Sequence, residues 1–156
     1  MSYSRPICKT CEIITKTDRA SGVVTHEEWR TNGKRDRADA PAYIERNATT
    51  GTVTCEAWYN DGELDRADSP AVIERDATTG AVTYEEWWKN GKRHHADGPA
   101  ALARDAATGV ATHEEWWKND KRHRADGPAV TERDAATGAI TREAWWKHGK
   151  RIARPS

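Results

Sequence analysis

Large residues suited to a hydrophobic core are scarce in this sequence of 156 residues. It has no Phe, one Met, and only 16 Val, Ile and Leu residues together. So few of these residues is typical of a disordered chain. Disordered chains usually carry a large net charge, however, whereas here 25 basic and 25 acidic residues balance. Eight Trp residues remain, each able to bury a large apolar area. We therefore expect a thin structure with local cores.

The sequence also lacks a net charge and long apolar runs. Balanced charge disfavours nucleic acid and anionic membranes as partners. No apolar run approaches the roughly 20 residues that span a bilayer, and residues 1–11 lack the apolar stretch of a secretory signal. Cys8, Cys11 and Cys55 are odd in number and form no disulfide framework. We expect a cytoplasmic protein with reduced thiols, no membrane span and no nucleic-acid partner.

A 29-residue repeat organises the chain. Each copy has a Trp at the same place, and these are Trp29, Trp58, Trp87, Trp116 and Trp145. Two residues before each Trp stands a Glu, namely Glu27, Glu56, Glu85, Glu114 and Glu143. Seventeen residues after the first four stands an Arg, namely Arg46, Arg75, Arg104 and Arg133. We expect five units over residues 12–152, between a tail or cap at 1–11 and a tail at 153–156, because terminal units of arrays are often atypical.

Turn signals divide each copy into strands. An Asn-Gly, Asp-Gly or similar pair follows the Trp, as at 32–33 and 61–62, and such pairs between strand-like runs predict type I′ hairpins. A second turn lies at ATTG, with Gly at the expected position of positive φ. The flanking runs, such as 81–88, are rich in Val, Thr and aromatic residues. No helical spacing of apolar residues occurs. The fold class predicted is all-β, an elongated antiparallel array of β-hairpins forming a single twisted sheet or an open solenoid.

Alternation along the strands assigns two faces. Thr25, Glu27 and Trp29 share one face with their equivalents in other copies, and we expect this face to be buried. The recurring Glu and Arg positions then predict structural ion pairs. The opposite face carries a column that varies between copies, which indicates solvent or a partner: His26, Cys55, Tyr84, His113 and Arg142.

The segment EEWWKNGKRH at 85–94, with its equivalents, resembles the MORN repeat. The D-G-P-A segment at 97–100 is similar to that of bacterial MORN-variant proteins. In place of the family's G-x-G in the return strand, this chain has residues such as RHRADGP at 122–128. The resemblance implies an elongated sheet of hairpins and a role as a scaffold for protein interaction. Some bacterial variants are antitoxin components, which makes an inhibitor of one specific enzyme the alternative.

A second Trp follows the recurring one in three copies, at Trp88, Trp117 and Trp146. Neighbours on a strand point to opposite faces, so we expect the first Trp in the core and the second in an exposed row. This row suits a protein partner, and it keeps a carbohydrate-binding module as a further alternative. The other candidate binding residues are Tyr84, His113, His94 and His123. Strand edges also allow a homo-oligomer.

Catalytic and metal sites find little support in the sequence. Cys8 and Cys11 would be half of a zinc site, but no second pair exists. No nucleophile elbow, phosphate loop or H-E-x-x-H motif occurs. Acidic residues that recur in every copy at structural positions indicate architecture. We expect no catalysis, no cofactor and no metal.

Overall fold

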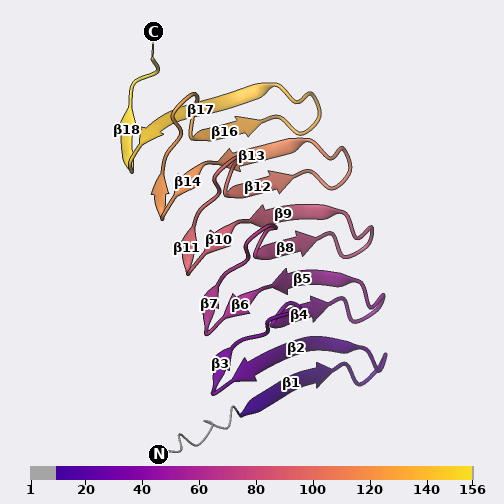
Figure 1. The fold of residues 1–156 in the computed structure, drawn as a ribbon. Coiled ribbons are helices and arrows are strands. Elements are labelled where there is room, and N and C mark those ends of the chain that lie inside the picture. Colours follow the sequence, from indigo (N-terminus) through magenta and orange to yellow (C-terminus); the bar gives the residue numbers. More distant parts are fainter. Residues whose placement is uncertain (1–9, 156) are drawn as a thin grey trace, which may run out of the picture.

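The molecule is an elongated stack of antiparallel β-hairpins. The computed structural model describes residues 10–155, and within this range it contains strands, turns and loops but no helix. The strands follow one another along the long axis, with β1 (Cys11–Thr17) at one end of the stack and β18 (Lys150–Ile152) at the other (Figure 1). The all-β prediction is confirmed. Cys8 and most of the predicted tail at 1–11 lie outside the described residues.

One 12-stranded sheet contains the long strands in the order β1-β2-β4-β5-β8-β9-β12-β13-β16-β17-β18, with β3 paired to β2. Its strands are β1 (Cys11–Thr17), β2 (Val24–Thr31), β3 (Lys34–Arg35), β4 (Tyr43–Arg46), β5 (Val53–Ala57), β8 (Val72–Arg75), β9 (Val82–Glu86), β12 (Ala101–Arg104), β13 (Ala111–Glu115), β16 (Val130–Arg133), β17 (Ile140–Lys147) and β18 (Lys150–Ile152). Three two-stranded hairpins complete the fold: β6 (Tyr59–Asn60) with β7 (Glu63–Leu64), β10 (Trp88–Lys89) with β11 (Lys92–Arg93), and β14 (Trp117–Lys118) with β15 (Lys121–Arg122).

The short hairpins turn where the sequence predicts type I′ turns. Asn32 and Gly33 have φ of 52° and 78°, and the equivalent pairs are alike. Asn119-Asp120 lacks the glycine, yet Asp120 adopts a φ of 60°. Its backbone N–H donates to the Arg93 carbonyl, and its carboxylate accepts from the Arg93 N–H at 2.8 Å. These two bonds to the preceding hairpin offset the strain of positive φ in a residue with a Cβ.

The ATTG loops are held by an Asp or Asn at their start. Asp76 accepts bonds from the backbone N–H of Thr78 and Thr79, at 3.0 and 2.7 Å, and Gly80 closes the loop at a φ of 73°. Asn47 makes the same two backbone contacts in its copy. Because the short side chain replaces backbone partners in the turn, the loop needs no packing from outside.

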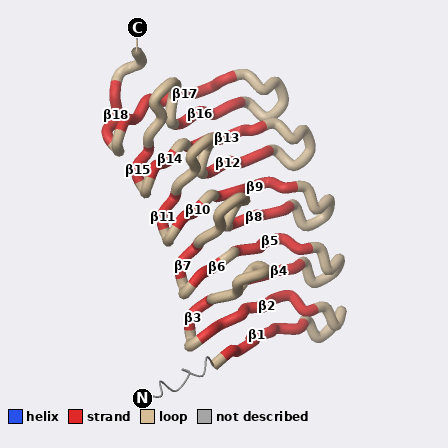
Figure 2. Tube along the Cα trace, in the orientation of Figure 1, coloured by secondary structure: helices blue, strands red, loops and turns tan. Residues whose placement is uncertain are grey.

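The face of the sheet that bears Trp29 and its equivalents, here the Trp29 face, is covered by chain. From the short hairpins the chain runs back towards the next long strands (tan segments in Figure 2). These return loops end in Pro-Ala, and Ala42, Ala71, Ala100 and Ala129 are wholly buried. In the long strands, Glu27 of β2 lies directly opposite Ile44 of β4, and Ile44 is buried. The recurring Glu and Arg form ion pairs, as predicted: Glu27–Arg46, Glu56–Arg75, Glu85–Arg104 and Glu114–Arg133.

The opposite face, here the Glu28 face, differs from the expectation of an open surface. The position before the recurring Trp is the buried position of β2, β5, β9, β13 and β17: Glu28, Ala57, Glu86, Glu115 and Ala144. The recurring Trp residues on the other face are half-buried and not fully enclosed. The reason is that only the return loops, and no second sheet, cover the Trp on its face, whereas the Glu28 face is covered by its own long side chains.

Candidate functional site

An Arg or His side chain from each return loop covers the recurring Trp. The guanidinium carbon of Arg66 lies 3.7 Å from the centre of the Trp58 ring, and the His95 ring stacks on Trp87 at 4.6 Å. The same side chains hold their loops, because Arg66 donates to the Pro70 carbonyl at 3.0 Å. Arg37 and Arg124 do the same in their copies, over Trp29 and Trp116. The recurring Trp thus fixes the return loop as well as filling space.

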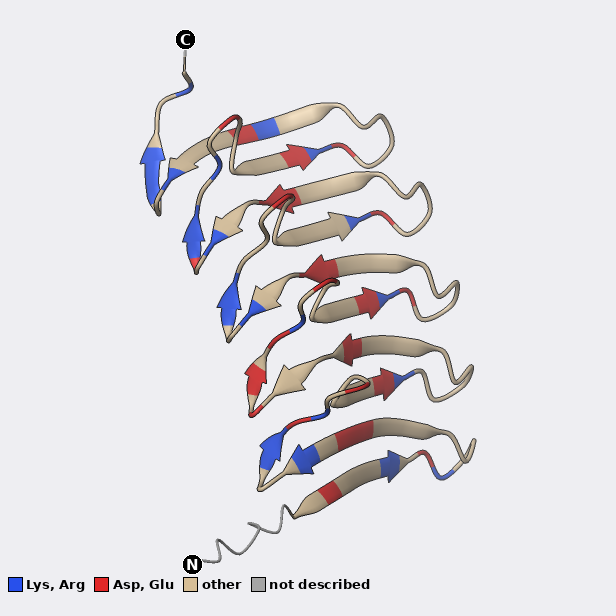
Figure 3. Ribbon diagram, viewed as in Figure 1, with Lys and Arg blue, Asp and Glu red and all other residues tan. Residues whose placement is uncertain are grey.

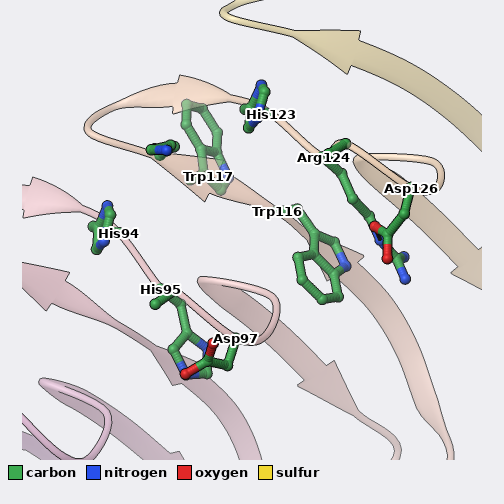
Figure 4. Close-up of a pocket in the computed structure, with 11 residues that line it drawn as sticks. His94, His95, Asp97, Trp116, Trp117, His123, Arg124 and Asp126 are labelled. Atoms are coloured by element: carbon green, nitrogen blue, oxygen red, sulfur yellow. Dashed lines mark hydrogen bonds and ion pairs between the residues drawn. The ribbon is translucent and has the colours of Figure 1, made fainter.

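Successive return loops leave a row of similar recesses between them. The largest, about 620 Å³, lies between the loops of His95 and Arg124, with Trp116 at its base (Figure 4). Equivalent recesses of about 320 and 470 Å³ lie one and two copies earlier, over Trp87 and Trp58. Exposed carboxylates at their rims come from Asp39, Asp68, Asp97 and Asp126. The Trp29 face therefore offers a line of partly apolar, charge-rimmed hollows.

On the Glu28 face a buried carboxylate connects three side chains. Glu115 accepts a hydrogen bond from Trp117 Nε1 at 2.8 Å and one from Arg122 at 2.6 Å, and His113 lies 3.3 Å away. Burial alone would raise the pKa of Glu115. The bond from Trp117 and the charge of Arg122 outweigh burial, so the pKa lies below its ordinary value. Glu86 makes the equivalent contacts with Trp88 and Arg93.

Arginine and aromatic rings then alternate along this face. The Arg93 guanidinium lies 5.3 Å from the Trp88 ring and 5.4 Å from the Trp117 ring. Arg122 lies 5.1 Å from Trp117 and 5.4 Å from Trp146. These contacts link neighbouring copies through cation–π attraction. The three second Trp residues are half-buried, which corrects the prediction of a free exposed row.

Sequence reasoning missed this acidic network, although a signal was present. Where Glu is replaced by Ala57, the Arg seven residues later is replaced by Leu64. In the other copies before the last, Glu and Arg occur together: Glu28–Arg35, Glu86–Arg93 and Glu115–Arg122. Paired loss of opposite charges marks a buried ion pair, because either charge alone would be costly.

The variable column of the Glu28 face is drawn into the same contacts. The Tyr84 hydroxyl donates to Glu86 at 2.7 Å, and burial raises the pKa of Tyr84 above its ordinary value. His113 also lies 3.8 Å from Glu132. Burial raises the pKa of the Cys55 thiol to about 11, so this thiol stays protonated at neutral pH. Tyr84, His113 and Cys55 are half-buried.

His94 and His123 stand at one position in successive copies, where earlier copies have Asp36 and Asp65. Asp65 accepts from the backbone N–H of Asn90 in the next turn at 2.8 Å, and His123 Nδ1 accepts from that of His148 at 3.2 Å. Nδ1 of His94 is enclosed without a partner among the described residues. Both His residues line the largest recess, so the structure brings these two together and leaves Tyr84 and His113 on the other face.

Residues 10–155 contain no group of three or more His, Cys, Asp or Glu arranged to hold a metal ion. Cys11 is a free, exposed thiol at the start of β1. The same range holds no helix long and apolar enough to cross a membrane.

The chain matches no known protein-family model, no curated protein and no solved structure. The resemblance to MORN repeats therefore stays a prediction from the sequence.

Proposed function

We propose that this chain is a non-enzymatic scaffold for protein–protein interaction, and that its partner docks along the return loops of the Trp29 face. The observation that carries the proposal is the row of equivalent recesses between successive loops. A row of similar hollows suits an extended protein surface, whereas catalysis needs one place where reactive groups converge.

The composition of the recesses supports a protein partner. The largest combines a half-buried Trp116, the cations Lys118 and Arg124, and the exposed carboxylates of Asp97 and Asp126. Protein interfaces commonly join an aromatic or Arg anchor to a polar rim. The recurring Glu and Arg, by contrast, are occupied by ion pairs within the sheet.

The carbohydrate alternative is less well supported by the contacts of the second Trp residues. A sugar-binding row needs free ring faces, but the rings of Trp88 and Trp117 lie against Arg93. Their indole N–H groups are also bonded to Glu86 and Glu115. A sugar would have to displace a guanidinium at each ring.

The test is capture of a partner from native-host extract, with the recesses filled in a matched pair of variants. Ala96 and Ala125 are exposed and line the largest recess, so A96R/A125R should block it. Ala107 and Ala136 are exposed in the ATTG-type loops, so A107R/A136R makes the same chemical change away from the recesses. We expect wild type and A107R/A136R to retain a protein that A96R/A125R loses.

Two results would contradict the proposal: no protein retained by wild type, or equal retention by both variants. Recovery of one enzyme, in stoichiometric amount and inhibited in the complex, would assign the inhibitor function instead.

Self-association through a strand edge is a further part of the proposal. All seven residues of β1 are exposed, and 62% of Ile13 is accessible. An unpaired, exposed edge strand is a template for another chain. Light scattering should show a dimer for the wild type and a monomer for Ile13→Lys. A monomer for both proteins would contradict self-association through β1.

A further inference from the structure

Six lysines form a compact strip on the last three short hairpins. They are cross-strand partners within each hairpin: Lys89 with Lys92, Lys118 with Lys121, and Lys147 with Lys150. Cross-strand partners lie on one face, and in β14–β15 the residues Trp117 and Arg122 take the other. Figure 3 shows Lys and Arg gathered along the side of the molecule that carries the short hairpins.

The lysine strip is not neutralised within the described part of the chain. All six side chains are exposed, and none takes part in an ion pair among residues 10–155. In an earlier copy, Lys34 pairs with Asp61 at 3.1 Å. Like charges placed directly opposite each other destabilise a β-ribbon. Residues 10–155 therefore carry three successive unfavourable pairs, with no ion pair from the same residues to offset them.

The fold itself does not require these lysines. The equivalent positions in the copy immediately before the strip carry Asn60 and Glu63, in a hairpin of the same register. The position that accepts a hydrogen bond from the next turn also loses its acidic residue, because Asp65 is followed by His94 and His123 in the later copies. The short hairpin before the strip thus carries an acidic residue where the last three carry only lysines, although the net charge of the chain is zero.

The strip is continuous with the largest recess. Lys118 and His123 line that recess. Burial first, and then the charges of His148, Lys118 and Lys147, lower the pKa of His123. A ligand seated in the recess would therefore meet lysines from neighbouring hairpins.

We propose that the lysine strip binds an acidic, extended segment of a partner protein lying across the last three hairpins. This inference rests on the proposed scaffold function and names the chemistry of its partner. Backbone bonds join each short hairpin to the next, as from Gly149 N to Arg122 O at 3.0 Å. Equivalent lysines are therefore two strand spacings apart, about 9–10 Å. A segment in the polyproline II conformation rises about 3.1 Å per residue with three residues per turn. Every third side chain then lies on one side, at about 9 Å spacing, and meets a lysine pair.

The observations favour a protein segment over nucleic acid. Arg93 and Arg122, whose planar groups would suit phosphate, are held by Glu86 and Glu115 on the other face. Exposed Asp97 and Asp126 beside the strip would repel a continuous phosphate backbone. A peptide can place neutral or basic residues opposite those two carboxylates.

The experiment measures binding of a fluorescent peptide of about ten glutamates, long enough to span the strip at roughly 3.3 Å per residue. A glutamine peptide and an oligothymidylate of the same length serve as comparison probes. K118N/K121E installs the residues of the earlier copy, Asn60 and Glu63. K16N/R19E makes the same change in net charge at exposed residues near the other end. K89N/K92E is a second strip variant in case the first unfolds, and circular dichroism checks each.

We expect the glutamate peptide to bind wild type, to weaken as salt rises, and to bind K118N/K121E about tenfold more weakly. K16N/R19E should stay within about twofold of wild type. Equal binding by wild type and strip variants, or no binding at low salt, would overturn the inference. Tighter binding of the oligothymidylate would overturn it in favour of nucleic acid. If K118N/K121E still retains the partner captured from extract, the scaffold function stands and only the acidic-segment inference fails.

Discussion

Trp117 donates its indole N–H to Glu115 across 2.8 Å, two residues away on the same face of the sheet. Glu115 is 7% exposed and also accepts from Arg122. A carboxylate at the surface of a one-layer sheet is buried because an indole and a guanidinium cover it. The pair shows how this chain replaces a missing aliphatic core with long polar side chains that shield one another.

Removing Glu115 alone should be more harmful than removing its ion pair. Glu115→Ala leaves the half-buried Arg122 and the Trp117 N–H without their acceptor, and we expect a loss of about 1–3 kcal/mol in the free energy of unfolding. E115A/R122L reproduces Ala57 and Leu64 of another copy and should recover at least half of that loss. Urea denaturation measures both. A double variant less stable than E115A would show that the ion pair is not the coupled element.

The second Trp residues should differ in their contribution to stability. Trp117 lies between Arg93 and Arg122 and is bonded to Glu115, whereas Trp146 contacts Arg122 in a copy that has Ala144 in place of Glu. We expect Trp117→Ala to cost about 2–3 kcal/mol and Trp146→Ala about 1 kcal/mol. The exposed row expected from the sequence would instead give little loss for both, because an exposed side chain contributes little to stability. Equal, small shifts of the urea midpoint would restore that earlier expectation.

Acid should weaken the ATTG-type loops through their leading aspartates. Hydrogen bonds from Thr79, first its backbone N–H and then its hydroxyl, lower the pKa of Asp76 below 3.8. A carboxyl group whose pKa is lowered in the folded state stabilises the fold at pH values above its ordinary pKa. This contribution is lost as the pH falls through the folded-state pKa. Asp76→Asn, which copies Asn47, keeps the backbone bonds without titrating. Its stability should fall less than that of wild type between about pH 6 and about pH 3, measured by urea denaturation. An identical fall in the two proteins would contradict this.

Mild acid should loosen the last hairpin. Burial first, and then the charges of His148, Lys118 and Lys147, lower the pKa of His123 below 6.5. The folded state then binds fewer protons than the unfolded state. The stability of the fold therefore falls as the pH drops through the ordinary pKa of histidine. Protonated Nδ1 can no longer accept from the His148 N–H.

The matched variant is His123→Asp, since Asp65 accepts the equivalent bond in its own copy. Hydrogen exchange at the His148 amide should speed up in wild type between about pH 7.5 and about pH 5.5, relative to the chemical rate, and less so in the variant. The same protection in both proteins at both pH values would rule out His123 as the titrating acceptor.

Sequence reasoning succeeded where a local rule acts. Asn32-Gly33 specified its turn because few residues accept positive φ twice in succession. Alternation placed Glu27 and Arg46 on one face, and their ion pair follows from that register. These features depend on neighbours in the chain or on the next strand, so the repeat alone was enough to predict them.

The sequence by itself thus determined an all-β chain of hairpins, its turns and its recurring Glu–Arg pairs. Only the tertiary structure decided which side chains are buried and where charge gathers. Glu115 is buried because Arg122 of its own copy covers it. Trp117 is half-covered because Arg93 reaches it from the preceding copy, more than 20 positions away in the sequence. The lysine strip likewise exists only because stacking brings three short hairpins side by side. A zero net charge cannot show that strip, because it sums over the whole chain and does not say which positions the fold places side by side.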